Sequence, residues 1–129
     1  MPLSKLHVPV GMPAELCRAA GEALHLSLVD TCGVNPDDNF CLIARYATED
    51  MIVHPTFLGE RDPAVTVVIE ITLLAGRSEA QKEALHVDVR ERLAVLGIEP
   101  ANVILFLVEN GPADWSFSDA GSVKTVLGL

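Results

Sequence analysis

Positively charged residues are scarce in this sequence. Nine Lys and Arg residues stand against 18 Asp and Glu residues, which gives a formal net charge of −9 at pH 7. A nucleic-acid backbone is bound by a basic face, so this composition argues against nucleic acid as a partner. Small anionic ligands stay possible where single cations are placed locally.

Long apolar runs and a signal-peptide layout are also missing. The longest apolar run, from Ala64 to Ala75, is interrupted by Glu70 and has the length of a buried strand. Lys5, His7 and Glu15 interrupt any apolar region near the start. We therefore expect a cytoplasmic protein with no membrane partner. Half of the residues are nevertheless hydrophobic, and we expect the excess to be buried between subunits.

Metal-ligating and redox patterns are absent from the sequence. The three cysteines are an odd number without metal-type spacing, and the four histidines form no H-x-x-E-H or H-E-x-x-H group. We expect no metal site. Cys17, Cys32 and Cys41 are typical of small core residues in a reducing cytoplasm. A nucleophilic role for Cys32 or Cys41 is disfavoured, because no base can be assigned to either.

What the sequence does contain is an alternation of strands and helices in a single domain, 1–129. Ser78 and Gln81 form a capping box before the second helix, and Gly33 and Gly97 end the two helices. The tail from 109 to 129 is rich in turns. The predicted strands are 3–10, 39–46, 65–74 and 103–108, with a further short strand at 51–54, and the predicted helices are 14–31 and 79–96.

The two halves of the chain repeat one pattern, and the repeats cover about 2–63 and 64–129. Gly11-Met12-Pro13 lies where Gly76-Arg77-Ser78 lies in the second half. The string Glu-Ala-Leu-His occurs at 22–25 and again at 83–86, and a Gly-x-x-Pro turn occurs at 33–36 and 97–100. Two β-α-β units with right-handed crossovers predict an α/β (α+β) fold. We expect a four-stranded mixed sheet with two helices on one face and another subunit covering the other face.

The start of the chain offers an unusual base. Pro2 is small enough for Met1 to be removed, and the chain would then begin with a secondary amine. The reference α-amino pKa is about 8, and an apolar pocket or a nearby cation lowers such a value. A base that titrates near neutral pH suits proton abstraction beside a carbonyl. Many ordinary proteins also begin with Met-Pro, so this dipeptide alone decides nothing.

Two charged residues are placed where loops meet the ends of predicted elements. Arg77 lies between a strand end and a helix start, where α/β units bind anions, and it could grip a carboxylate. The alternative is an ordinary solvated arginine. Asp38 precedes the second strand beside Asp37. It could orient a water or shuttle a proton, or it could simply support a solvated turn.

One aromatic pair occurs in the tail. Trp115 and Phe117 alternate, so in an extended segment both side chains face the same way. They could form a small satellite core under the tail. They could also wall a pocket and exclude water from a base within it.

Together, Pro2, the duplicated unit, Ala75-Gly76-Arg77-Ser78 and Asp114-Trp115-Ser116-Phe117 resemble the tautomerase superfamily, in its long fused-repeat branch near malonate semialdehyde decarboxylase. The resemblance covers nearly the whole chain. It implies a homotrimer, a small oxo-acid substrate and no cofactor. It also implies Pro2 as the catalytic amine, Arg77 as the binder of a carboxylate or carbonyl, Asp38 as the water-activating acid of the decarboxylase, and Trp115 and Phe117 as pocket walls.

The sequence departs from that pattern at three positions. Ala75 stands where the decarboxylase has a second arginine, Met12 stands where many relatives have arginine, and Ser118 stands where relatives often have glycine. Loss of one charge-assisted contact weakens carboxylate binding by about 1.5–3 kcal/mol. Specialised decarboxylation or dehalogenation is therefore less well supported than a simpler reaction.

These residues lead to three hypotheses about function. The first is keto–enol tautomerisation of a small 2-oxo or 3-oxo acid, with Pro2 as base and Arg77 holding the developing enolate. The second is hydration and decarboxylation of a 3-oxo acid such as malonate semialdehyde by Pro2, Asp38 and Arg77, with a protonated proline as acid. The third, of another class, is a trimeric binding protein with a silent site.

Overall fold

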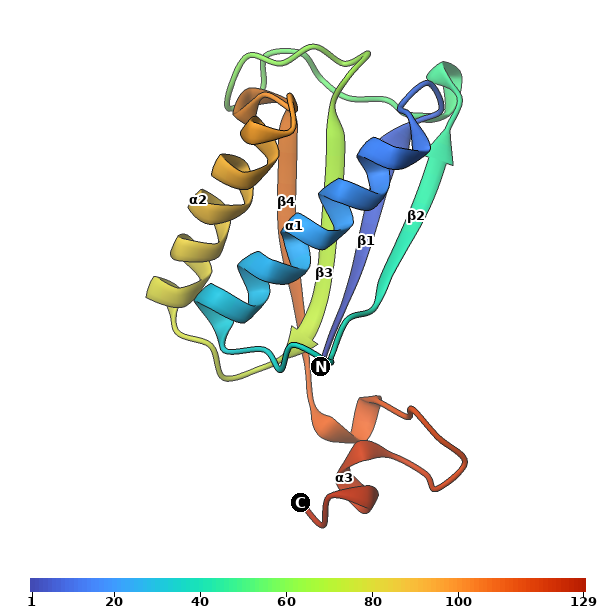
Figure 1. Cartoon of the computed structure of the whole chain (residues 1–129), viewed down its shortest axis with the longest axis vertical. Coiled ribbons are helices and arrows are strands. Elements are labelled where there is room, and N and C mark those ends of the chain that lie inside the picture. Colours follow the sequence, from blue (N-terminus) through green and yellow to red (C-terminus); the bar gives the residue numbers. More distant parts are fainter.

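A four-stranded sheet in the order β2-β1-β3-β4 carries both long helices on one face (Figure 1). The computed structural model describes all residues from 1 to 129. The strands are β1 (Pro2–Pro9), β2 (Cys41–Tyr46), β3 (Val67–Leu74) and β4 (Val103–Asn110). The helices are α1 (Ala14–Cys32), α2 (Glu79–Val95) and the short α3 (Val123–Val126), with 3-10 turns η1 (Thr48–Asp50), η2 (Pro100–Asn102) and η3 (Pro112–Asp114).

The strand directions confirm the expected pair of β-α-β units. β1 and β2 are parallel, β3 and β4 are parallel, and the two units meet where β1 and β3 pair antiparallel. In that central pair Pro2 lies opposite Leu73. The start of β1 and the end of β3 therefore lie at one edge of the sheet, where the C-terminal segment also leaves β4 (Figure 1).

Alternation along the strands places the core under the helices. In β3, Val67, Ile69, Ile71 and Leu73 are fully buried, while the residues between them are half-buried on the other face. These side chains pack with the buried stripe of α1 and α2 in a core of 18 residues. Full burial of each such side chain contributes about 1.5–3 kcal/mol. The core therefore fixes which face of each strand meets the helices.

The face of the sheet away from the helices stays partly open. Leu42 is 55% exposed, and Phe106 and Val108 are 43% and 42% exposed. At the centre of this face His7 bonds to Tyr46 Oη at 2.6 Å and to Glu70 Oε1 at 3.1 Å. The face is thus mostly apolar, with His7, Tyr46 and Glu70 forming a polar group across three strands and Lys5 paired with Glu70.

Local signals set the helix ends. Ser78 Oγ accepts a hydrogen bond from Gln81 N, and Gln81 Oε1 accepts one from Ser78 N, which confirms the predicted capping box. α1 ends at Gly33, whose φ of 66° is the left-handed conformation that glycine adopts without strain. None of the helices combines the length and apolar character that a bilayer crossing requires.

The short strand predicted at 51–54 is wrong. These residues are irregular, because side chains rather than a neighbouring strand satisfy the backbone of this loop. Arg61 donates to the carbonyls of His54 and Phe57, and His54 Nδ1 accepts from Thr56 N and Phe57 N. The long loop so formed crosses from β2 to β3 at the edge opposite the chain start (Figure 1).

The structure confirms the predicted match of 11–13 with 76–78 but corrects the match of the two Glu-Ala-Leu-His strings. The equivalent strands β1 and β3 begin at Pro2 and Val67, and the equivalent helices begin at Ala14 and Glu79, so both starts are 65 residues apart. The matching Glu-Ala-Leu-His strings are only 61 residues apart, about one helical turn out of register. In the correct register His25 of α1 corresponds to Arg90 of α2.

Candidate functional site

The N-terminal amine and the carboxylate of Asp38 meet at the start of β1. The Met1 ammonium donates to Asp38 Oδ2 at 2.6 Å, and the side chains of Met1 and Asp38 are 19% and 20% exposed. Pro2, the next residue, is buried. The structure therefore places Asp38 beside the end of the chain, where the sequence alone gave no contact between them.

A tight turn between α1 and β2 presents Asp38. Asn35 Oδ1 accepts from Asp37 N, and the Asn35 carbonyl accepts from Asp38 N, each at 2.9 Å. Asn and Asp favour such turns because their side chains bond to backbone two residues on. The next backbone bond, from Ser4 N to the Phe40 carbonyl at 3.0 Å, ties the end of the turn to β1.

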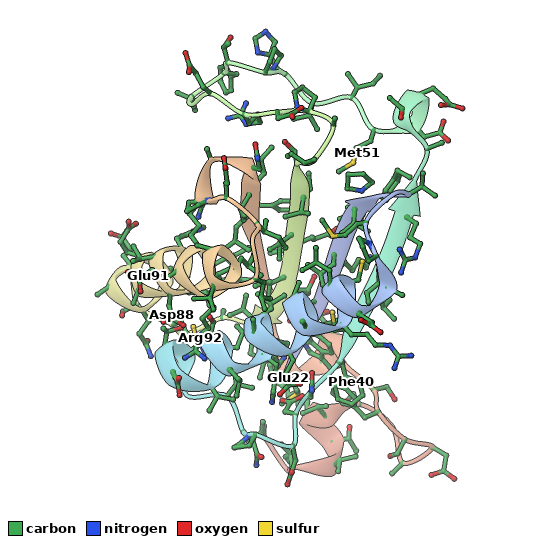
Figure 2. The ribbon with its side chains drawn as sticks, turned by 45° about the horizontal axis from the view of Figure 1, so that its top comes forward. Glu22, Phe40, Met51, Asp88, Glu91 and Arg92 are labelled. Carbon is green, nitrogen blue, oxygen red and sulfur yellow. The ribbon has the colours of Figure 1, made fainter.

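A cavity of about 330 Å³ opens beside this pair of charges. Most of its lining is apolar, so the amine and carboxylate face a space from which water is partly excluded. Phe40 and Phe117 lie on its wall with ring centroids 5.2 Å apart. Figure 2 shows Phe40 beside the C-terminal segment. The lining residues are Met1, Asp38, Phe40, Phe117, Ser118, Gly121, Val123, Val126 and Leu127.

Trp115 supports this wall from behind. Its ring stacks on Phe117 with centroids 5.6 Å apart and planes within 6°. Its Nε1 donates to Asn110 Oδ1 at 2.6 Å, and its carbonyl accepts from Val123 N at 2.8 Å. Trp115 therefore ties the C-terminal segment to the end of β4, while Phe117 lines the cavity itself.

Arg77 lies at the same edge of the sheet but is turned to the protein backbone. Its Nε donates to the Cys32 carbonyl at 3.3 Å and its Nη1 to the Leu74 carbonyl at 3.2 Å. These bonds use two of the five N–H donors of a guanidinium, so three stay available for a ligand. The cavity beside Asp38 does not include Arg77 in its lining.

An acidic neighbour lowers the net positive charge around Arg77. The pKa of Glu109 lies below its ordinary value, chiefly because its carboxylate accepts a hydrogen bond from Lys82. The charges of Lys82 and Arg77 and a bond from Gly76 N lower it further, and desolvation opposes them with a smaller effect. Glu109 is therefore ionised near neutral pH. Any anion held by Arg77 must compete with this carboxylate.

Several residues of the cavity were missed by the sequence analysis. Phe40 lies two residues after Asp38 on the same extended segment, a spacing that could have indicated a shared face. Val123 and Val126 follow Ser122, whose side chain caps α3 by accepting from Thr125 N at 3.2 Å. The cap at Ser122 before Val123 and Val126, close after Trp115 and Phe117, was the sequence pattern that could have predicted this apolar side of the cavity.

A second cavity, of about 710 Å³, lies at the opposite edge of the sheet. By the 65-residue repeat its lining residue Met12 corresponds to Arg77. The strand registers also make Asn102 the counterpart of Asp38. Asn102 Oδ1 accepts from Asp62 N at 2.8 Å, where Asp38 accepts from the chain end. At this second edge the chain continues into β3 from the preceding loop, so no terminal amine is present there.

The cysteine and metal hypotheses gain nothing from the structure. Burial raises the pKa of the Cys41 thiol, which keeps it protonated and a poor nucleophile. The side chains include no group of three or more His, Cys, Asp or Glu residues close enough to hold a metal ion. The charged groups that the structure brings together at this edge of the sheet are the terminal amine and the Asp38 carboxylate.

The fold and this edge are those of a small α/β protein built around a terminal amine, and comparison with known proteins supplies the family. A family model described as "Tautomerase enzyme" matches residues 38–118. The chain belongs to the tautomerase family, as its sequence motifs suggested.

Similar proteins and structures extend the match over nearly the whole chain. Two probable tautomerases of Bacillus subtilis (strain 168) are 27% and 28% identical over 120 and 118 residues. YusQ covers 92% of this chain and 94% of its own length, and YrdN covers 91% of each. The FG41 malonate semialdehyde decarboxylase inhibited by 3-bromopropiolate has a TM-score of 0.88 at 30% identity, over 98% of this chain and 95% of its own. A fused 4-OT described as a symmetric trimer shares the fold, with a TM-score of 0.79 at 22% identity over 96% and 98%.

Proposed function

We propose that this chain is an enzyme that moves a proton beside the carbonyl of a small oxo acid, with the Pro2 amine as base after loss of Met1. The observation that carries the proposal is the contact of the chain end with Asp38 at the mouth of an aromatic cavity. Loss of Met1 would leave a secondary amine one residue further into β1, within the same apolar surroundings.

In keto–enol tautomerisation the Pro2 nitrogen takes a proton from carbon. The C–H electron pair forms the C=C bond of the enol, and negative charge moves to the carbonyl oxygen. Asp38, which contacts the amine of Met1 one residue before Pro2, would stabilise the ammonium that develops on Pro2, because a nearby opposite charge favours the charged form. Arg77 would have to turn its free N–H donors toward the substrate to hold the oxygen or a carboxylate.

Hydration and decarboxylation of a 3-oxo acid such as malonate semialdehyde is the second candidate. Two observations favour it: the likeness to malonate semialdehyde decarboxylase at 30% identity and the carboxylate beside the amine. A protonated Pro2 would polarise the carbonyl, and Asp38 would activate the water. Ala75 leaves Arg77 without a second arginine nearby in sequence, so the carboxylate would be held more weakly.

We further propose that the enzyme is a homotrimer in a reducing cytoplasm. The support is the half-exposed apolar face of the sheet, the trimeric state in the names of fused 4-OT structures, and three free cysteines. Sedimentation equilibrium checks the assembly, and a monomer would contradict it.

Ketonisation of phenylenolpyruvate by Met-free protein tests the main proposal. Intact-mass analysis first establishes that Met1 is gone, and Pro2→Ala protein is the control. Equal rates for the two proteins would contradict the proposal and leave a binding protein with a silent site. A titration of Pro2 by NMR separates the two reactions: a midpoint near pH ~6 indicates a base, and one above ~8 indicates an acid.

A further inference from the structure

The turn that presents Asp38 is held from α1 by a buried histidine. His25 is only 7% exposed, and an imidazole so buried is costly unless its nitrogen atoms are hydrogen-bonded. Its Nε2 lies 2.8 Å from the carbonyl oxygen of Pro36. Because a carbonyl can only accept, Nε2 carries the hydrogen and donates it.

We propose that His25 is a positioning residue that fixes Asp38 against the N-terminal amine through this bond. Its consequence for catalysis rests on the function proposed above, whereas its consequence for the amine itself does not. Pro36 lies two residues before Asp38 in a turn whose own hydrogen bonds, from Asp37 N and Asp38 N to Asn35, make it a unit. The proline ring also fixes φ at Pro36. Movement of Pro36 therefore carries the Asp38 carboxylate with it.

The contact at stake tolerates little movement. The Met1 ammonium nitrogen and Asp38 Oδ2 are 2.6 Å apart, and N–H···O hydrogen bonds extend only to about 3.2 Å and weaken steeply when bent. In Met-free protein the Pro2 nitrogen, one residue further along, takes the place of this amine as the neighbour of Asp38. The other end of the turn is fixed by the Ser4 N to Phe40 carbonyl bond at 3.0 Å, two residues after Asp38. His25 is the matching side-chain anchor before Asp38.

The second half of the chain contains the equivalent anchor without a terminal amine. Arg90 occupies the position of His25 in the repeat, and its Nη2 donates to the Val103 carbonyl at 2.8 Å. That carbonyl follows Asn102, the counterpart of Asp38. Both helices thus hold the entrance to the following strand, but only His25 does so next to the chain end. Arg90 is therefore a matched control for a purely structural role.

The test uses full-length Met-free protein and follows the titration of the Pro2 amine by NMR, which needs no substrate. Asp38→Asn removes the carboxylate and should lower the titration midpoint by about one unit or more. His25→Leu should lower it part of the way, by about half a unit. His25→Gln, whose amide can reach the same carbonyl, should restore it. Arg90→Leu should lower the melting temperature and leave the midpoint unchanged.

An unchanged midpoint in His25→Leu would overturn the proposal, as would an unchanged midpoint in Asp38→Asn. A shift of equal size in Arg90→Leu would also overturn it, because the effect would then be a general loosening. If His25→Leu does not fold, His25→Asn serves instead: its side chain is too short, so its midpoint should fall below that of His25→Gln. If the shift is found but no oxo acid is turned over, the proposed function fails and the positioning role stands.

Discussion

At the start of β1 the chain ends in an amine that meets Asp38, whereas at the start of β3 the chain continues and Asn102 meets a backbone N–H of Asp62. The halves share strand length, helix position and buried stripe. They differ in a few polar groups at one edge each. The fold therefore provides two equivalent edges, and under the proposed function the active one is the edge with the free amine, the carboxylate and the arginine.

The largest expected effect comes from removing the proline that only one half has. In Met-free protein, Pro2→Ala should lower kcat/KM for an oxo acid by about 10²–10⁴-fold, the usual contribution of a general acid or base. The equivalent change Val67→Ala should leave the activity of folded protein intact and cost about 2 kcal/mol of stability, because Val67 is 1% exposed. Steady-state kinetics and urea unfolding check the pair. Similar activity losses in both variants would contradict the assignment of the active edge.

Exchange of the arginine and methionine tests the second difference. Arg77→Met should raise KM about ten- to a hundredfold, which corresponds to about 1.5–3 kcal/mol for a lost charge-assisted contact. Met12→Arg, at the equivalent place in the second half, should leave KM unchanged. Kinetics over a substrate series, with thermal unfolding as a control for the lost bonds to Cys32 and Leu74, decides the matter. An unchanged KM in Arg77→Met would show that this side chain only supports the backbone.

A carboxylate can also be added to the silent edge. Asn102 is 7% exposed and accepts from Asp62 N, so Asn102→Asp buries a charge close to another acid. We expect a loss of about 1–3 kcal/mol in the free energy of unfolding and no new activity, because no amine is present to use the carboxylate. Urea unfolding measures the loss, and Asn102→Ser is the uncharged control. A gain of activity in Asn102→Asp would contradict the conclusion that the edge without an amine is inactive.

The smallest effect concerns the network that joins the two halves. Ser27 of α1 donates to Asp88 of α2 at 2.6 Å, and Arg92 donates to Asp88 and to Asp30; Figure 2 shows Asp88 and Arg92 between the helices. Desolvation opposes ionisation of Asp88, but hydrogen bonds from Ser27 and Arg92 and the charge of Arg92 outweigh it, so the pKa of this carboxyl lies below its ordinary 3.8.

A lowered pKa in the folded state gives stability above the unfolded pKa, and this stability is lost as pH falls through the folded value. At pH 6 the free energy of unfolding of wild-type protein should therefore exceed that of Asp88→Asn by about 0.5–1 kcal/mol. The value is modest because the groups are partly exposed. The difference should shrink below pH ~4. Thermal unfolding of both proteins from pH 6 to pH 2.5 checks this. A difference that grows on acidification would contradict it.

Local patterns predicted most of the fold. The alternation in β3 and the reciprocal Ser78–Gln81 cap depend on neighbours in sequence, and both were read correctly. The Met51–His54 segment was predicted wrongly because it ends in side-chain bonds that strand propensity does not record: the His54 carbonyl accepts from Arg61, and the His54 ring accepts from Phe57 N. An identical four-residue string in two amphipathic helices was likewise ambiguous by one helical turn, so the Glu-Ala-Leu-His strings were matched out of register, whereas 11–13 and 76–78 were matched correctly.

The residues Pro2, Asp38, Arg77, Trp115 and Phe117 stay predictions as a functional site, and their arrangement in space was not predictable from the sequence. Met1, Asp38 and Phe117 lie far apart in sequence, and only the packed sheet and tail bring them to one cavity, with Pro2 as the buried residue that follows Met1. Arg77 was placed correctly between β3 and α2, yet the carbonyls that hold it come partly from α1. Contacts of this kind depend on long-range packing, which sequence periodicity does not encode.

The cavity draws its walls from the first residue, from the turn at Asp38 and from α3. A ribosome releases the amine first and the segment from Val123 to Leu127 about ninety residues after the turn. A growing or shortened chain can thus form the sheet and carry a free amine while one side of its cavity is missing. The tail from 111 to 129 is thus a separable part of the site, because the four strands that hold the chain start end before it.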